Sequence, residues 1–136
     1  MPSSFALSVV SPARSVVEET VTSVVAPGSE GYFGVNAGHV PIIASLKPGT
    51  LEYVEVGGMR RYVYVAGGFA EVSGARVTIL ADEATPAPEI DLAKAEVELE
   101  HARRALRGED APLKQEEAVE VVERAVQKLK TARIGR

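Results

Sequence analysis

The sequence from Gly28 to Leu46, Gly-Ser-Glu-Gly-Tyr-Phe-Gly-Val-Asn-Ala-Gly-His-Val-Pro-Ile-Ile-Ala-Ser-Leu, combines closely spaced glycines with apolar side chains. Glycine adopts positive φ and allows close approach of the backbone. Apolar residues such as Phe33, Val35 and Ile42 lie between and just after the glycines. We therefore expect short strands and turns that fold back on a sheet and present a surface. A set of ordinary β-turns in an all-β domain is the simpler alternative.

The glycine spacing argues against phosphate chemistry. A Walker loop closes its glycine run with Lys-Ser or Lys-Thr, whereas no lysine follows this run before Lys47. The dinucleotide-binding fingerprint needs its first two glycines two residues apart, and Gly28 and Gly31 are three apart. His39 has no second histidine or cysteine nearby, so we interpret it as a turn residue rather than a metal ligand or catalytic group.

Four motifs, taken in order along the chain, resemble a known family. They are Val9-Val10-Ser11-Pro12, the glycine stretch with Gly28-Ser29-Glu30-Gly31, Gly34 and Gly38-His39-Val40-Pro41, then residues 65–72 and 77–82. Their order and spacing resemble the epsilon subunit of bacterial F-type ATP synthases over essentially the whole chain. Each motif alone is weakly specific, whereas the four in this order are strong.

The composition is typical of a soluble globular protein, with 46% hydrophobic and 25% charged residues in a chain of 136. The net charge of −4 provides no global basic field, so we do not expect nucleic acid as a partner. Cysteine is absent, which excludes disulfides and thiolate chemistry. No apolar run approaches the roughly 18 residues that span a bilayer, and no basic leader precedes Phe5, so we expect a protein that stays in the cytoplasm.

Residues 5–82 show the alternation of β-strands, which places one of two alternating sets of side chains on a buried face. The sets are Phe5, Leu7 and Val9 against Ala6, Ser8 and Val10, and Val21, Ser23 and Val25 against Thr20, Thr22 and Val24. Gly57-Gly58 and Ser73-Gly74 are typical hairpin turns. Many short strands with regular turns predict a β-sandwich or flattened barrel.

Two prolines, Pro86 and Pro88, interrupt the strand pattern between Glu83 and Glu89. Because proline fits neither a sheet nor a helix interior, we expect a short, stiff linker here. The linker divides the chain into a β-sandwich domain, residues 1–84, and an α-helical hairpin, residues 85–136. The predicted fold class is therefore mostly β plus α, with the sandwich or flattened barrel followed by an antiparallel two-helix hairpin.

Beyond the linker, apolar residues recur every three or four positions, as in amphipathic helices. The stripes are Leu92, Ala95, Leu99, Ala102 and Leu106, then Ala118, Val122, Ala125, Leu129 and Ala132. Asp91 is the expected N-cap of the first helix, Gly108 its end, and Pro112 belongs to the first turn of the second. Alanine side chains bury little apolar area, and at about 25 cal/mol per Å² the seam between the helices contributes little stability. We therefore expect the hairpin to dock on another surface and to detach at modest cost.

Charge is uneven along the second helix. Glu116, Glu117, Glu120 and Glu123 crowd its start, and Arg124, Lys128, Lys130, Arg133 and Arg136 follow. A solvated helix whose charges favour its dipole is the simple interpretation. The functional interpretation is a basic tip that binds an acidic partner.

The resemblance implies a rotor subunit that couples rotation of the c-ring to the catalytic head and carries out no bond chemistry. The sandwich would bind the gamma subunit and the c-ring through the stretch from Ser29 to Ile43, and we choose Glu30, Tyr32 and His39 as contact residues. The subunit would be peripheral, on the cytoplasmic face of the bacterial plasma membrane.

The resemblance also implies a regulatory hairpin. Extended along gamma, the hairpin would meet the alpha and beta catalytic subunits and block ATP hydrolysis. Arg124, Lys128, Lys130 and Arg133 are the positions that we expect to contact acidic residues there.

No cofactor is required, but some members of the family bind ATP on the hairpin as a regulatory ligand. Their motif is Ile or Leu, Asp, two variable residues, Arg, Ala. The matching positions are Ile90, Asp91, Lys94 and Ala95, with Arg124 and Lys128 as basic contacts from the second helix. Lys94 replaces the arginine and loses its bidentate fork, so we expect weaker binding.

Two other classes of function stay open. One is a free-standing β-sandwich adaptor whose hairpin binds a partner helix. The other is a small enzyme, which is disfavoured because no nucleophile–base pair or carboxylate dyad has catalytic spacing.

Overall fold

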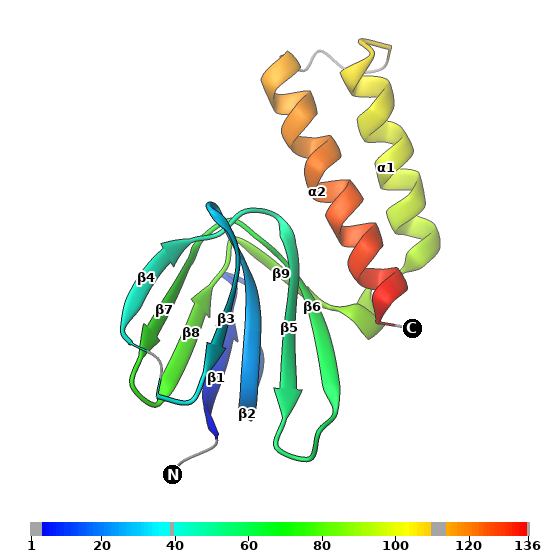
Figure 1. Cartoon of the computed structure of the whole chain (residues 1–136). Helices are drawn as coiled ribbons and strands as arrows, with labels where there is room; N and C mark the ends of the chain where they lie inside the picture. Colours follow the sequence, from blue (N-terminus) through cyan, green and yellow to red (C-terminus); the bar gives the residue numbers. More distant parts are fainter. Residues whose placement is uncertain (1–3, 39, 110–113, 136) are drawn as a thin grey trace.

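The computed structural model describes residues 4–38, 40–109 and 114–135. Figure 1 shows the strands gathered into one curved body and two helices rising from one side of it. The strands are β1 Phe5–Val10, β2 Ser15–Gly28, β3 Gly31–Asn36, β4 Ile42–Ser45, β5 Gly49–Glu55, β6 Arg60–Ala66, β7 Phe69–Ser73, β8 Arg76–Leu80 and β9 Glu83–Pro86. The helices are the 3₁₀ helix η1 Ala87–Glu89, α1 Leu92–Leu106 and α2 Gln115–Ile134.

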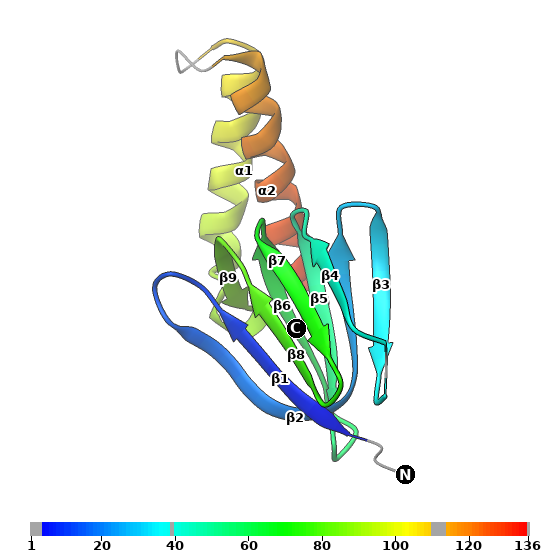
Figure 2. The same cartoon turned by 90° about the vertical axis from the view of Figure 1, so that its left-hand side faces the viewer.

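The described strands form one nine-stranded sheet in the order β4-β7-β8-β1-β2-β5-β6-β9, with β3 paired to β2 beside this path. The sheet curls, so strands from both of its ends enclose a single apolar core (Figure 2). Leu7, Leu51 and Ile79 come from different parts of the sheet and are at most 1% exposed. The predicted β-sandwich followed by a two-helix hairpin is confirmed.

The glycine-rich stretch forms β3, β4 and the turns around them, as expected. Gly28 pairs with Gly31 at the turn between β2 and β3, where Gly31 has a φ of 130°. Gly38 has a φ of 81°, again in the region that favours glycine. Val35 is 2% exposed and belongs to the core. The described residues of the stretch, 28–38 and 40–46, are therefore strands and turns folded onto the sheet.

Strand β2 breaks the alternation predicted for it. Val21 and Val24 are both at most 1% exposed, although they belong to opposite alternating sets. The register between β2 and β5 shifts between Val21 and Ser23, so side chains beyond this point turn to the other face. The prediction of one buried set along this strand is therefore wrong, whereas in β1 Leu7 and Val9 are buried as predicted.

The predicted linker begins too early. Residues 83–86 form β9, which pairs with β6 in the register Val65↔Ala84 and Val63↔Pro86. A proline is tolerated here because β9 is an edge strand and Pro86 is its last residue. Residues 87–89 then form η1, which connects the sheet to α1. The sheet thus extends to Pro86, and the division into two domains stays a prediction.

Helix α1 begins and ends as predicted. The Asp91 carboxylate accepts a hydrogen bond from the Lys94 backbone N–H at 3.1 Å. Gly108, with a φ of 76°, follows the last turn. Pro112 lies outside the described residues, and α2 begins at Gln115.

The helices pack through small side chains and dock on the sheet by one end. Ala95, Ala102 and Ala132 are at most 2% exposed. The C-terminal half of α2 lies against β5, β6 and η1, while the opposite end of the hairpin points away from the sheet (Figure 1). Tyr64 of β6 and Leu129 of α2 belong to the apolar cluster that joins them. The hairpin therefore docks on another surface, as its weak alanine seam predicted.

Candidate functional site between the helices and the sheet

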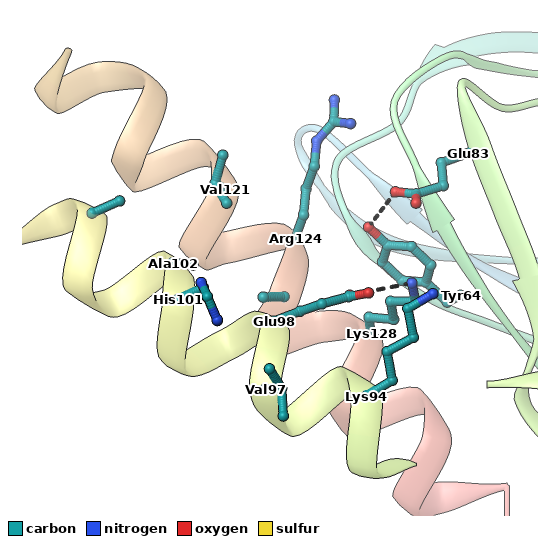
Figure 3. Close-up of a pocket in the computed structure, with 12 residues that line it drawn as sticks. Tyr64, Glu83, Lys94, Val97, Glu98, His101, Ala102, Val121, Arg124 and Lys128 are labelled. Atoms are coloured by element: carbon teal, nitrogen blue, oxygen red, sulfur yellow. Dashed lines mark hydrogen bonds and ion pairs between the residues drawn. The ribbon is translucent and has the colours of Figure 1, made fainter. Parts of the chain in front are cut away.

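A hollow of about 690 Å³ opens between α1, α2 and the sheet at β6 and β9. Its wall is mostly apolar, with charged groups at one side. The lining residues include Tyr64, Glu83, Lys94, Val97, Glu98, His101, Val121, Arg124 and Lys128. Figure 3 shows the side chains of Lys94, Glu98 and Lys128 meeting beside Tyr64. The hairpin geometry thus brings cations from both helices to one space.

A smaller hollow of about 140 Å³ adjoins the first and shares Lys94, Glu98 and Lys128 with it. Ile90, Asp91 and Ala95 line this smaller hollow. The six residues proposed for nucleotide contact therefore gather at two neighbouring hollows. Their local roles differ, because Ile90 and Ala95 are buried in the apolar cluster and Asp91 caps α1.

Two cations of the hollow, Arg124 and Lys128, have carboxylate partners. Lys128 Nζ lies 3.4 Å from Glu98 Oε2, and Arg124 Nη2 lies 3.1 Å from Glu120 Oε1. Arg124 Nε is buried and makes no hydrogen bond within the part of the chain that the structure describes. A buried donor without an acceptor is unfavourable, so this N–H favours an incoming hydrogen-bond acceptor.

Tyr64 and Glu83 also line the hollow, and no motif in the sequence marked them as site residues. The Tyr64 hydroxyl donates a 2.9 Å hydrogen bond to Glu83 Oε1, and the Tyr64 side chain is fully buried. Burial and the neighbouring Glu83 carboxylate raise the pKa of the Tyr64 hydroxyl far above its usual value. In the sequence Tyr64 belongs to an ordinary strand and Glu83 to a presumed linker. Only the docking of the hairpin over β6 and β9 brings them into a site.

The raised pKa of Tyr64 has a measurable consequence at high pH. Above pH 10, the tyrosine ionises in the unfolded chain but stays protonated in the folded one, because its folded pKa is raised. On account of this residue, the free energy of unfolding should therefore fall increasingly steeply above pH 10, approaching about 1.4 kcal/mol per pH unit near pH 12. Urea unfolding should show a shallower fall for Tyr64→Phe, and parallel curves would contradict this.

The residues chosen for rotor contacts separate into two places. Glu30 just before β3 and Tyr32 at its start are exposed, and Tyr32 lines a cleft with residues of α2. His39 lies outside the described residues, and its described neighbours Gly38 and Val40 follow the opposite end of β3 (Figure 2). The length of this strand therefore separates Glu30 and Tyr32 from the Gly38–Val40 region.

A further exposed surface was not anticipated from the sequence. Ile43 of β4, Phe69 of β7 and Leu80 of β8 are 74%, 57% and 52% exposed. Phe69 pairs with Leu80 and with Ser45, two residues after Ile43, so the three side chains share one side of neighbouring strands. We call these three residues the apolar face. Clustered exposed apolar side chains of this kind mark protein–protein contacts.

The four cations expected to meet the catalytic head lie in the docked half of α2, not at the free end of the hairpin. The antiparallel hairpin returns the chain to the sheet, which carries the basic segment with it. Arg124 and Lys128 line the hollow, Lys130 lines a cleft with Tyr32, and Arg133 lies 3.6 Å from Glu96. In the docked form the basic segment is thus partly neutralised within the hairpin.

Comparison with known proteins decides the family. A family model described as ATP synthase, Delta/Epsilon chain, beta-sandwich domain matches residues 4–87. The chain is 41% identical over 132 residues to the ATP synthase epsilon chain of Solibacter usitatus, covering 97% of this chain and 98% of that protein. The chain belongs to the ATP synthase epsilon chain family. A second epsilon chain, from Desulfatibacillum aliphaticivorans, is 44% identical over 110 residues, covering 81% of this chain and 78% of that protein.

Chains in two solved ATP synthase structures also match. A chain of the Euglena gracilis mitochondrial ATP synthase, in an OSCP/F1/c-ring structure, matches with a TM-score of 0.81 and 29% identity, covering 93% of this chain and 80% of that one. A chain from the central stalk/c-ring structure of the Tetrahymena thermophila enzyme matches with a TM-score of 0.57. This second match covers 96% of this chain and 94% of that one, and at 12% identity it shows the fold alone.

The described residues of this epsilon-chain family member lack two other kinds of feature. No described helix has the length and apolar character needed to cross a membrane. No group of three or more His, Cys, Asp or Glu side chains that could hold a metal ion was found among residues 4–38, 40–109 and 114–135.

Proposed function

We propose that this chain is a rotor subunit in the central stalk of a proton-translocating ATP synthase, where it couples c-ring rotation to the catalytic head. The observation that carries this proposal is the 41% identity to an epsilon chain across both the sheet and the hairpin. In this role the subunit performs no bond chemistry. Its curled sheet, with one continuous core, transmits torque because it deforms little.

The proposed partners of the sandwich are the gamma subunit and the c-ring. The apolar face of Ile43, Phe69 and Leu80 offers the kind of area that such a contact buries. Glu30, Tyr32 and His39 remain the proposed contacts outside this face. Attachment through these partners would hold the subunit at the cytoplasmic face of the bacterial plasma membrane, as a peripheral component.

A pull-down with purified gamma and c-ring tests this proposal. The tagged chain should retain gamma, and Phe69→Glu should reduce recovery about tenfold or more, because aromatic side chains at interface centres carry much of the binding energy. Val97→Glu is the matched control, since Val97 is 56% exposed but lies on α1. Failure of the unmodified chain to retain gamma would exclude the rotor role and favour the free-standing adaptor.

The proposed role of the hairpin is to inhibit ATP hydrolysis. In an extended form, α2 would leave the sheet and place Arg124, Lys128, Lys130 and Arg133 against acidic residues of the alpha and beta subunits. Two observations support this. The docked form rests on a small apolar cluster, and Arg124 and Arg133 take part in largely exposed ion pairs that a stronger acidic partner can replace.

The hollow between the helices is the proposed site for ATP as a regulatory ligand. Its volume of about 690 Å³ lies within the range of small-molecule pockets. Lys94, Arg124 and Lys128 supply positive charge, and the unpaired Arg124 Nε–H is a ready donor. The carboxylates of Glu83 and Glu98 repel a phosphate group, and Lys94 stands where the motif has an arginine. Both features favour weak binding of ATP. The site needs residues from both helices, so ATP would bind the docked hairpin more tightly than the extended one. This difference in affinity would shift the population toward the docked form.

Isothermal titration of the isolated chain with ATP tests this site. Lys94→Arg should strengthen binding about fivefold, because arginine can hold a phosphate with two hydrogen bonds. Asp91→Ala should weaken binding and lower helix stability by about 1 kcal/mol through the lost cap. Lys47→Arg, outside the hollow, is the control. If neither the unmodified chain nor Lys94→Arg gives heat at millimolar ATP, the motif is only a helix start.

A further inference from the structure

A hydrogen bond between two threonines joins the sheet directly to α2. Thr50 Oγ1 of β5 and Thr131 Oγ1 of α2 are 2.6 Å apart, and Thr131 is 0% exposed. The Thr131 hydroxyl also donates to the Gln127 carbonyl at 3.0 Å. Since a hydroxyl has one hydrogen, Thr50 is the donor and Thr131 the acceptor between the two. Both hydroxyls are then satisfied at the edge of the docking contact, where Thr50 also lines a cleft with Gln127 and Lys130.

Thr50 is itself held from the other side by Tyr32. The Thr50 backbone N–H donates to the Tyr32 hydroxyl at 3.1 Å. The β2–β5 register ends at Val25↔Glu52, so this N–H lies beyond the ladder and the tyrosine takes the place of a strand partner. A Cβ on Gly49 would lie 2.6 Å from Tyr32 Oη, so glycine is needed there to admit the hydroxyl. A continuous chain of hydrogen bonds thus runs from β3 through β5 to α2.

The same end of α2 is closely packed, so the threonine contact cannot slide. Ala132 is 0% exposed and Leu129 is 6% exposed. A Cβ on Gly135 would overlap the Ala87 side chain of η1. Close packing therefore fixes the position of α2 on the sheet, and the threonine pair marks this position.

We propose that Tyr32, Thr50 and Thr131 form a latch that sets how often the hairpin leaves the sheet and connects β3 to that event. A hydroxyl pair suits this purpose, because water replaces both hydrogen bonds when the helix leaves and the net stabilisation stays small. Tyr32 is 51% exposed, so a contact at the start of β3 can reach the latch. The proposal rests on the proposed function only in treating hairpin release as the regulated step.

The test measures transient undocking in the isolated full-length chain. The chain has no cysteine, so Leu129→Cys introduces a unique thiol in the docking cluster. When undocking is fast and rare, the rate of thiol labelling is proportional to the undocked fraction. Every latch variant is compared in this Leu129→Cys background.

Thr131→Val and Thr50→Val should each raise the labelling rate about fivefold, which corresponds to about 1 kcal/mol for one net hydrogen bond. The double variant Thr50→Val/Thr131→Val should return to within about twofold of the parent, because two apolar partners of the same shape restore complementarity. Tyr32→Phe keeps the ring and should raise the rate about twofold to threefold through the lost acceptor.

Matched controls separate the latch from general loosening. Thr131→Ser keeps the hydroxyl and Thr78→Val changes a threonine on β8, so both should label at the parent rate. Equal labelling in the parent and the single variants would overturn the latch. So would additive effects in the double variant, or an equal loss in the urea stability of the whole chain. None of these measurements involves ATP hydrolysis, so the latch and the inhibitory role can fail independently.

Discussion

Ending the chain after Ile90 should raise ATP hydrolysis by the assembled enzyme at least about fivefold, the lower end of usual regulatory couplings, while assembly and ATP synthesis persist. The sheet ends at Pro86 and η1 at Glu89, so this cut removes only α1 and α2 and keeps the paired edge strand. The apolar face of Ile43, Phe69 and Leu80, which we propose binds gamma, is also untouched. Hydrolysis and synthesis rates of purified complexes in vesicles are the measurement.

A disulfide between Thr50→Cys and Thr131→Cys provides the matched control for this truncation. The two hydroxyl oxygens are 2.6 Å apart, which brings the replacing sulfurs within reach of a disulfide. A hairpin locked on the sheet cannot extend, so the oxidised variant should hydrolyse ATP as fast as the truncated one, and reductant should restore inhibition. If truncated and intact complexes hydrolyse ATP equally fast under every condition, the hairpin is not inhibitory here.

Replacing Arg124, Lys128, Lys130 and Arg133 by alanine should relieve most of the same inhibition without removing the helices. Charge attraction to an acidic partner is the proposed basis, so added salt should mimic part of the effect, with screening over ~8 Å at physiological ionic strength. The docked hairpin should remain folded, because exposed ion pairs such as Arg133–Glu96 contribute little to stability. Hydrolysis rates across a salt series are the measurement.

The control for this variant removes four cations near the free end of the hairpin. Arg103 and Arg104 lie in the last turn of α1, Arg107 directly follows α1, and Lys114 directly precedes α2. Their replacement should leave inhibition and its salt dependence within about twofold of the parent, since surface substitutions away from a contact have small effects. Unchanged inhibition in the α2 variant would instead indicate steric blocking by the helices.

Local features of the fold could be predicted from the sequence because nearby residues determine them. The change from alternating to three-and-four spacing separated strands from helices, and Asp91 and Gly108 marked the bounds of α1. Gly57-Gly58 and Ser73-Gly74 marked two hairpins. The order of four short motifs was enough for a resemblance to the epsilon subunit, which the comparisons confirmed.

Only the tertiary structure decided where these elements meet. The register shift near Val21 and the edge pairing of β9 depend on neighbouring strands, and no local pattern encodes them. The candidate site forms only when the hairpin is docked on the sheet, because Tyr64 and Glu83 come from two strands and the cations from two helices.

The latch shows the same limit at a single contact. Thr50 and Thr131 are 81 positions apart in the sequence, and no local pattern distinguishes either threonine from its neighbours. Spacing along the chain specifies which face of an element is apolar, since periodicity acts over a few residues. Which two faces touch depends on sheet curvature, on the path of β9 and η1, and on the small side chains that let α2 approach. The sequence by itself therefore determined the elements and the family, and the packing of α2 on β5 and β6 determined the site.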